Sequence, residues 1–244
     1  QKIVRLQGSA SLALEISIMN FVSGKVLLIQ TGYYSSRLEE ILKNNKLIND
    51  IKCVPFNKVE NCEGKFDWII SCFVETSLGI KVPENVLFNL KKKHKSKLLL
   101  DATASIGLEK NHDIADVIAY SSCKGLCGLT GGAFIAYNEL ELNDVSSFYM
   151  SINTHERKGV TGPYHIIQSL EKVLEDYDAK IYAIKINKEK FMDIFSSYLV
   201  FPSNLQPILC SNINKKVKCK NGIMYSPRLP TKGSMICHLG EAHL

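Results

Sequence analysis

The chain has 244 residues, of which 45% are hydrophobic and 22% are charged, and its formal net charge is +6. These values are ordinary for a soluble globular protein. No apolar run approaches the roughly 18 residues that a membrane span needs. The lysines within residues 91–97 are typical of a solvated helix end rather than of a nucleic-acid surface. We therefore expect neither a membrane nor a nucleic-acid partner.

The eight cysteines are spread along the chain without a C-x-x-C pair. A metal site needs clustered ligands, and a disulfide framework belongs to much shorter secreted chains. We therefore expect reduced thiols, a cytoplasmic location and no metal site. No signal peptide opens the sequence. It begins at Gln1 without a methionine, so a fragment or a processed form is also expected.

The first 160 residues alternate between strand and helix patterns. A turn of small residues at 7–11 precedes a helical pattern, where a serine is typical of an N-cap and the free N–H groups can also bind an anion. The expected strands cover 3–6, 25–30, a stretch near 53, and 66–72, and the expected helices cover 12–22, 35–45 and 86–94. This β-α-β rhythm predicts a three-layer α/β domain over residues 1–160.

The stretch 98–138 carries the main chemical signal. One buried strand ends at Asp101, a helical or looped crossover follows, and a second buried strand over 117–120 leads to Lys124 and a glycine-rich turn. Open α/β sheets place ligands at the carboxyl ends of their parallel strands. An acid and a lysine are therefore expected at one edge of one sheet.

The pattern changes after residue 160. Pro163 is suited to the first turn of a helix, and helical spacing continues to about residue 199. This predicts a connecting helical region over 161–199. Clusters of proline, asparagine and lysine around short apolar runs predict a small α+β C-terminal domain over 200–244.

Several familiar motifs are absent from the sequence. There is no P-loop, no G-x-G-x-x-G after the first strand and no G-x-S-x-G elbow. A lysine and an acid at two strand ends, with a serine-rich helix start, suit pyridoxal phosphate, whose aldehyde binds a lysine and whose ring nitrogen pairs with a carboxylate. From the residues alone, a non-catalytic α/β domain remains an equal alternative.

Spaced blocks of the sequence resemble the class V aminotransferases, which have the fold type I of pyridoxal-phosphate enzymes. The blocks are QGSASLALE, KVLLIQTGYYSSR, ETSLG, LLLDATASIG, SSCKG and GGAFIAY, followed less clearly by VTGPYH and IMYSPRLPTKGSMICHLGE. The resemblance implies a fold type I large domain with a mixed, mostly parallel sheet, which lacks the family's N-terminal segment, and a shortened C-terminal domain. It also implies a homodimer.

The resemblance assigns roles to individual residues. It implies that Lys124 is the Schiff-base lysine and proton shuttle, and that Asp101 pairs with the ring nitrogen. The other cofactor-binding residues that it implies are Ser9, Ala10 and Ser11 in the phosphate loop, Tyr34 stacked on the ring, Thr76 near the phenolic oxygen, Thr103 beside the ring, Ser122 at the phosphate, and Thr161 reaching the phosphate of a neighbouring subunit.

Three positions depart from the family pattern. Ala10 stands where a glycine is usual, and Cys123 replaces a polar residue just before the lysine. Met235 stands where an arginine binds the substrate carboxylate, and a thioether cannot form that bidentate ion pair. Arg228 or Lys232 could substitute as the cation.

The expected function is transfer of the amino group of 2-aminoethylphosphonate, or of a similar small amine, to pyruvate as the keto acid. Two alternatives stay open. One is a lyase on the same fold, and the other is a catalytically impaired homologue that acts as a structural or regulatory subunit.

Overall fold

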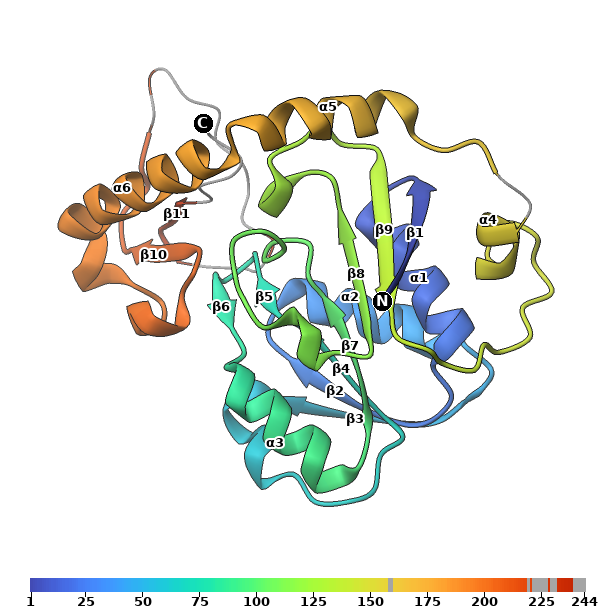
Figure 1. The fold of residues 1–244 in the computed structure, drawn as a ribbon. Coiled ribbons are helices and arrows are strands. Elements are labelled where there is room, and N and C mark those ends of the chain that lie inside the picture. The colour runs from blue at the N-terminus through green and yellow to red at the C-terminus, as the bar shows by residue number, and fades with distance from the viewer. Residues whose placement is uncertain (158–159, 219, 221–227, 229–231, 239–244) are drawn as a thin grey trace.

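The computed structural model describes residues 1–157, 160–218, 220, 228 and 232–238. A seven-stranded sheet forms its centre, in the order β1-β9-β8-β7-β4-β2-β3 (Figure 1). The strands are β1 (Lys2–Gln7), β2 (Gly24–Gln30), β3 (Ile48–Pro55), β4 (Trp68–Cys72), β7 (Lys97–Asp101), β8 (Val117–Ser121) and β9 (Gly132–Tyr137). Strands β8, β7, β4, β2 and β3 run parallel, whereas β9 is antiparallel to β8 and to β1. The predicted mixed, mostly parallel sheet is thereby confirmed.

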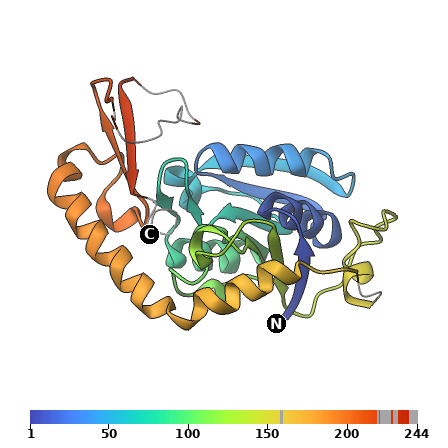
Figure 2. The same cartoon turned by 90° about the horizontal axis from the view of Figure 1, so that it is seen from above.

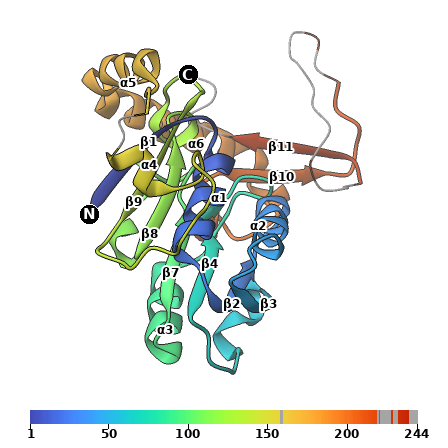
Figure 3. The same ribbon diagram turned by 90° about the vertical axis from the view of Figure 1, so that its right-hand side faces the viewer.

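Helices cover both faces of this sheet. Helices α1 (Ala10–Phe21) and α2 (Tyr33–Lys43) lie on one face, and α3 (Glu84–His94) lies on the other, as Figure 3 shows for α2 and α3. Consecutive residues of β4 enter opposite layers, since Ile70 packs with α1 and α2 whereas Ile69 packs with α3. Burial on both faces explains why the central strands are continuous apolar runs.

The crossover between β7 and β8 is a loop rather than a regular helix. Residues 102–116 contain a short 3-10 helix at His112–Ile114 and otherwise form turns. The loop returns the chain directly to the edge of β7, so that Asp101 and the segment after β8 lie at the same end of the sheet.

The second half of the chain runs along one side of the sheet. Helices α4 (Ile152–Arg157), α5 (Tyr164–Glu175) and α6 (Tyr177–Phe195) are followed by a two-stranded antiparallel sheet of β10 (Leu209–Ile213) and β11 (Ser234–His238) (Figure 2). A further small sheet joins β5 (Val74–Glu75) to β6 (Ile80–Lys81). The helical region thus has a break at Asp176.

Parts of the predicted C-terminal domain, at 219, 221–227, 229–231 and 239–244, lie outside the described residues. The division of the chain into domains therefore stays a prediction. Of the helices that the structure describes, none is both long and apolar enough to cross a membrane.

Candidate active site

A cavity of about 420 Å³ opens at the carboxyl ends of the parallel strands. Five chain segments meet there: the β1–α1 turn, the start of α2, the segment after β4, and the ends of β7 and β8 with their following loops. The lining residues are Gly8, Ser9, Ala10, Ser11, Leu14, Tyr34, Arg37, Leu38, Val74, Thr76, Asp101, Thr103, Ala104, Ser121, Cys123, Lys124, Thr130 and Gly131. The expected meeting of an acid and a lysine at one sheet edge is therefore observed.

Lys124 lies in the turn that follows β8. Its backbone φ of +57° is in the left-handed region, which costs a residue with a side chain roughly 1 kcal/mol. Gly125 makes the turn possible, because a Cβ there would lie 2.3 Å from the backbone oxygen of Ile106. The Lys124 Nζ lies 3.4 Å from the Thr76 hydroxyl oxygen and 4.8 Å from the centroid of the Tyr34 ring.

Asp101 ends β7 with its carboxyl group in the cavity wall. The backbone N–H and the hydroxyl of Thr103 donate to Oδ1 over 3.0 Å and 2.6 Å, which leaves Oδ2 for a ligand. Burial raises the pKa of this carboxyl above its ordinary value, and the hydrogen bonds from Thr103 and the charge of Lys124 offset only part of that rise. A buried acceptor of this kind is suited to a bound N–H group.

Tyr34 is held in place by a buried acid that the sequence did not single out. The Glu75 carboxylate is fully buried and accepts the backbone N–H groups of Tyr34 and Ser35 at the start of α2, over 3.1 Å and 3.2 Å. It also accepts hydrogen bonds from the backbone N–H and the hydroxyl of Ser77, the residue after Thr76. One carboxylate thus joins the aromatic side chain on α2 to the loop that carries the Thr76 hydroxyl.

The predicted phosphate loop lies where α1 begins. Ser9 precedes the first helical residue, Ala10, and its side chain makes no capping hydrogen bond. A helix N-terminus binds anions through its free N–H groups and its dipole. The Gly8 N–H donates to the oxygen of Gly131 over 2.8 Å, which joins this loop to the turn after Lys124.

Two of the predicted phosphate contacts do not reach the cavity. The Ser122 side chain is fully buried, donates to the carbonyl oxygen of Leu129 over 2.6 Å and accepts the N–H of Gly132, so its hydroxyl fixes the 129–132 turn instead. Its neighbours Ser121 and Cys123 line the cavity. Thr161 is exposed and does not line the cavity in this chain.

The expected substrate residues also lie outside the cavity lining. Met235 is half-buried on β11 and packs against an apolar cluster that includes Val74 and Ala104, two residues of the cavity wall. Arg228 is exposed, and its guanidinium carbon lies 5.5 Å from the ring centroid of Tyr33. Lys232 is exposed as well.

Arg37 is a cavity residue that sequence reasoning missed. It follows Tyr34 by three positions, a spacing that places both side chains on one face of a helix, and it falls within the block KVLLIQTGYYSSR. The helical spacing was a signal that could have found it.

No family model matches the chain, but individual proteins do. It is 26% identical over 207 residues to a 2-aminoethylphosphonate–pyruvate transaminase of Pseudomonas aeruginosa, which covers 72% of this chain and 54% of that protein. A transaminase of the same name from Phocaeicola vulgatus is 22% identical over 207 residues, 72% of this chain and 56% of that protein. The chain thus spans about half the length of the curated relatives it matches.

Solved structures share the fold at low identity. Pyridoxamine–pyruvate aminotransferase from Mesorhizobium loti superposes with a TM-score of 0.74 and 19% identity, over 89% of this chain and 65% of that one. Ureidoglycine–glyoxylate aminotransferase from Bacillus subtilis gives 0.69 and 16%, over 87% and 65%. A cysteine desulfurase from Thermococcus onnurineus gives 0.63 and 16%, over 86% and 63%. The resemblance seen in the sequence is confirmed: the chain is related to the class V aminotransferases and has their fold, that of the fold type I pyridoxal-phosphate enzymes.

Proposed function

We propose that this chain is a pyridoxal-phosphate-dependent aminotransferase that acts on a small amine with an acidic group. The observation that carries the proposal is the convergence of Lys124, Asp101 and the N-terminus of α1 on one cavity. The residues present fit the cofactor, because Asp101 is a buried residue of the cavity lining and its Oδ2 has no recorded hydrogen bond among the described residues. Pyridoxal phosphate supplies an electron sink for negative charge that develops at the substrate carbon.

Different residues of this chain are suited to hold different parts of the cofactor. Asp101 Oδ2 would accept the N–H of the ring nitrogen, and Tyr34 would offer its ring face for stacking. The backbone N–H groups at Ser9, Ala10 and Ser11 would bind the phosphate.

Proton transfer falls to Lys124. Its Nζ takes the proton from the carbon that bears the amino group of the substrate and returns a proton in the next step. The Thr76 hydroxyl oxygen, 3.4 Å from Nζ, accepts a hydrogen bond from the amine and so helps to fix its position in the cavity.

The names of the curated relatives support a finer proposal, that 2-aminoethylphosphonate is the amino donor and pyruvate the acceptor. A homodimer in which Thr161 of one subunit reaches the phosphate of the other belongs to the same proposal. The exposed position of Thr161 outside its own cavity is compatible with that arrangement.

The test is a titration of the purified chain with pyridoxal phosphate, monitored by visible absorption. Lys124→Ala should abolish the band of the lysine-bound cofactor. Lys172→Ala, at a lysine whose side chain is 79% exposed, is the control for reaction with surface lysines and should leave the band unchanged. Addition of 2-aminoethylphosphonate should then bleach the band, and addition of pyruvate should restore it.

Each outcome separates the alternatives. A band that 2-aminoethylphosphonate leaves unchanged rejects this donor and keeps the cofactor. A reaction that proceeds without any keto acid favours a lyase. A colourless chain that takes up no cofactor rejects both enzymatic readings and leaves a structural or regulatory subunit.

A further inference from the structure

Arg37 enters the cavity from α2 in a fixed orientation. Its guanidinium carbon lies 5.1 Å from the ring centroid of Tyr34 and 5.5 Å from that of Tyr33. Its Nη1 donates a hydrogen bond of 3.1 Å to the hydroxyl oxygen of Ser11. Two aromatic rings and one hydrogen bond therefore hold a half-buried cation beside the start of α1.

The positive charge of Arg37 has no recorded carboxylate partner among the residues that the structure describes. Two other partly buried cations in this chain do have one. Lys81 Nζ lies 2.6 Å from a carboxylate oxygen of Glu109, and Lys91 Nζ lies 2.8 Å from one of Asp116. A guanidinium carries five N–H donors in a planar fork suited to phosphate, so most of the donors of Arg37 remain available to an anion.

The hydrogen bond to Ser11 also sets the direction of a second donor. Because the Ser11 oxygen accepts the N–H of Arg37, its own hydrogen is left to donate to another group. Ser11 is the second residue of α1, where the N–H groups of the helix are free. An anion at this helix start would meet the hydroxyl and the guanidinium together.

The phosphate site otherwise has few side-chain donors in this chain. Ala10 has no hydroxyl group, and the Ser122 hydroxyl is occupied by the 129–132 turn. We propose that Arg37, acting with the Ser11 hydroxyl that it orients, is the counter-ion of the cofactor phosphate. This inference rests on the proposed function, since it concerns the same cavity and the same cofactor.

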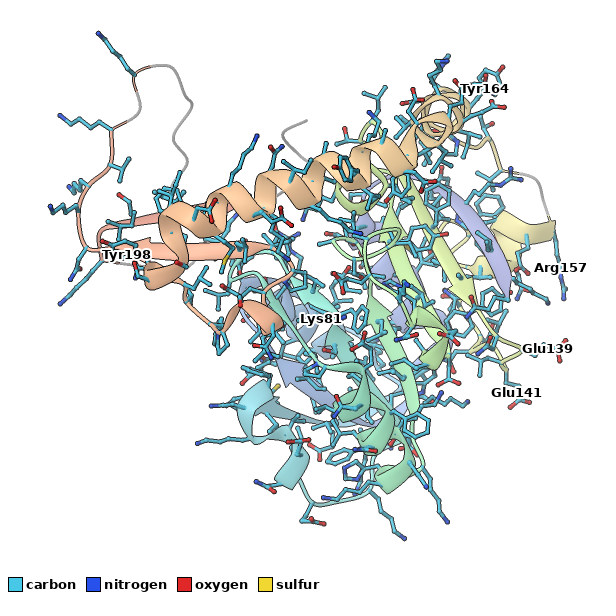
Figure 4. The ribbon with its side chains drawn as sticks, turned by 60° about the vertical axis from the view of Figure 1, so that its left-hand side comes forward. Lys81, Glu139, Glu141, Arg157, Tyr164 and Tyr198 are labelled. Atoms are coloured by element: carbon cyan, nitrogen blue, oxygen red, sulfur yellow. The ribbon has the colours of Figure 1, made fainter. Side chains whose placement is uncertain are left out.

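The experiment compares two ligands that differ only in the phosphate. Dissociation constants for pyridoxal phosphate and for pyridoxal are measured by visible absorption with the wild-type chain, Arg37→Gln, Arg37→Lys and Ser11→Ala. Arg157→Gln is the matched control, because Figure 4 shows this exposed arginine at the edge of the molecule near Glu139 and Glu141. Circular dichroism and thermal melting establish that each variant is folded.

Arg37→Gln should weaken the binding of pyridoxal phosphate about 10- to 100-fold, the range for a lost hydrogen bond to a charged group. The dissociation constant for pyridoxal should change by less than about 3-fold. Arg37→Lys should recover part of the loss, because it restores charge without the fork. In a double variant with Ser11→Ala, the Arg37 change should cost less than it does alone, because the two groups act together.

Equal weakening of both ligands would show a structural role for Arg37 and overturn the inference. Unchanged affinity for pyridoxal phosphate in Arg37→Gln would overturn it as well, and a loss confined to the affinity for 2-aminoethylphosphonate would assign the arginine to the substrate instead. A wild-type chain that binds neither ligand would reject the proposed function itself. A wild type that binds both equally would reject only the inferred phosphate contact.

Discussion

Replacement of Glu75 by alanine should destabilise the chain by about 3–5 kcal/mol. The carboxylate is fully buried and accepts from five donors. They are the backbone N–H groups of Tyr34, Ser35 and Ser77, over 3.1, 3.2 and 3.1 Å, and the hydroxyls of Ser77 and Thr31, over 2.6 and 3.3 Å. Alanine leaves all five donors without this acceptor.

The magnitude follows from the donors that cannot find a new partner. The two N–H groups at the start of α2 have no acceptor within their own helix, and each buried orphan costs about 1–3 kcal/mol. The hydroxyls of Thr31 and Ser77 can rotate toward other oxygens, so they add less. Loss of a negative charge at a helix N-terminus adds roughly 0.3–1 kcal/mol. Glu75→Gln keeps the side-chain volume and one acceptor oxygen, so this variant should lose less stability than Glu75→Ala.

Urea unfolding measures this loss through the fluorescence of Trp68, the one tryptophan of the sequence, which is 2% exposed. Glu63→Ala is the control, because Glu63 is 82% exposed and pairs with Lys93 at the surface, and it should leave the midpoint unchanged. A free energy of unfolding of Glu75→Ala within about 1 kcal/mol of the wild type, the range of exposed ion pairs, would refute the assignment of Glu75 as the acceptor that holds α2.

Two further substitutions test the cavity and its surroundings. Asp101→Asn should stabilise the cofactor-free chain near neutral pH. Burial raises the pKa of this carboxyl in the folded chain, so the wild type loses stability as the pH rises from about 4 through that raised pKa. The urea midpoints of the two chains should converge below about pH 4. A difference that is largest in acid would contradict this. Gly79→Ala should lower the melting temperature, because φ is +73° and the new Cβ would lie 1.8 Å from the carbonyl oxygen of Ile208, whereas Gly162→Ala, with nothing within 4 Å, should not. Equal melting temperatures for the two alanine variants would contradict the close approach at Gly79.

Much of the sheet could be predicted because burial acts through local sequence. The apolar runs that end at Asp101 and lead to Lys124 are buried on both faces, and no other packing explains such runs as well. Strand ends then place the acid and the lysine at one edge without any knowledge of side-chain contacts. The meeting of Asp101 and Lys124 at one edge of the sheet therefore follows from topology alone.

Long-range contacts account for what the sequence did not predict. Helix α2 begins at Tyr33, two residues before the expected start, because the Glu75 carboxylate, 40 residues away from Ser35 in the chain, accepts the N–H groups of its first turn. The direction of the Ser122 hydroxyl is likewise set by the 129–132 turn rather than by the residues beside it. Neither partner is visible in a local window.

The two ends of the candidate site are built by different parts of the chain. The cofactor end draws on the sheet and its loops, where hydrogen bonds join Asp101, Lys124 and Ser11 to fixed neighbours. At the substrate end, Met235 packs into an apolar cluster, and a thioether cannot replace the bidentate ion pair of an arginine. If Arg37 serves the phosphate, Arg228, whose guanidinium carbon lies 5.5 Å from the centroid of the Tyr33 ring, is our candidate for the cation that binds the substrate. If the proposed function holds, we therefore expect this chain to differ from its relatives mainly in how it recognises the acidic group of the substrate.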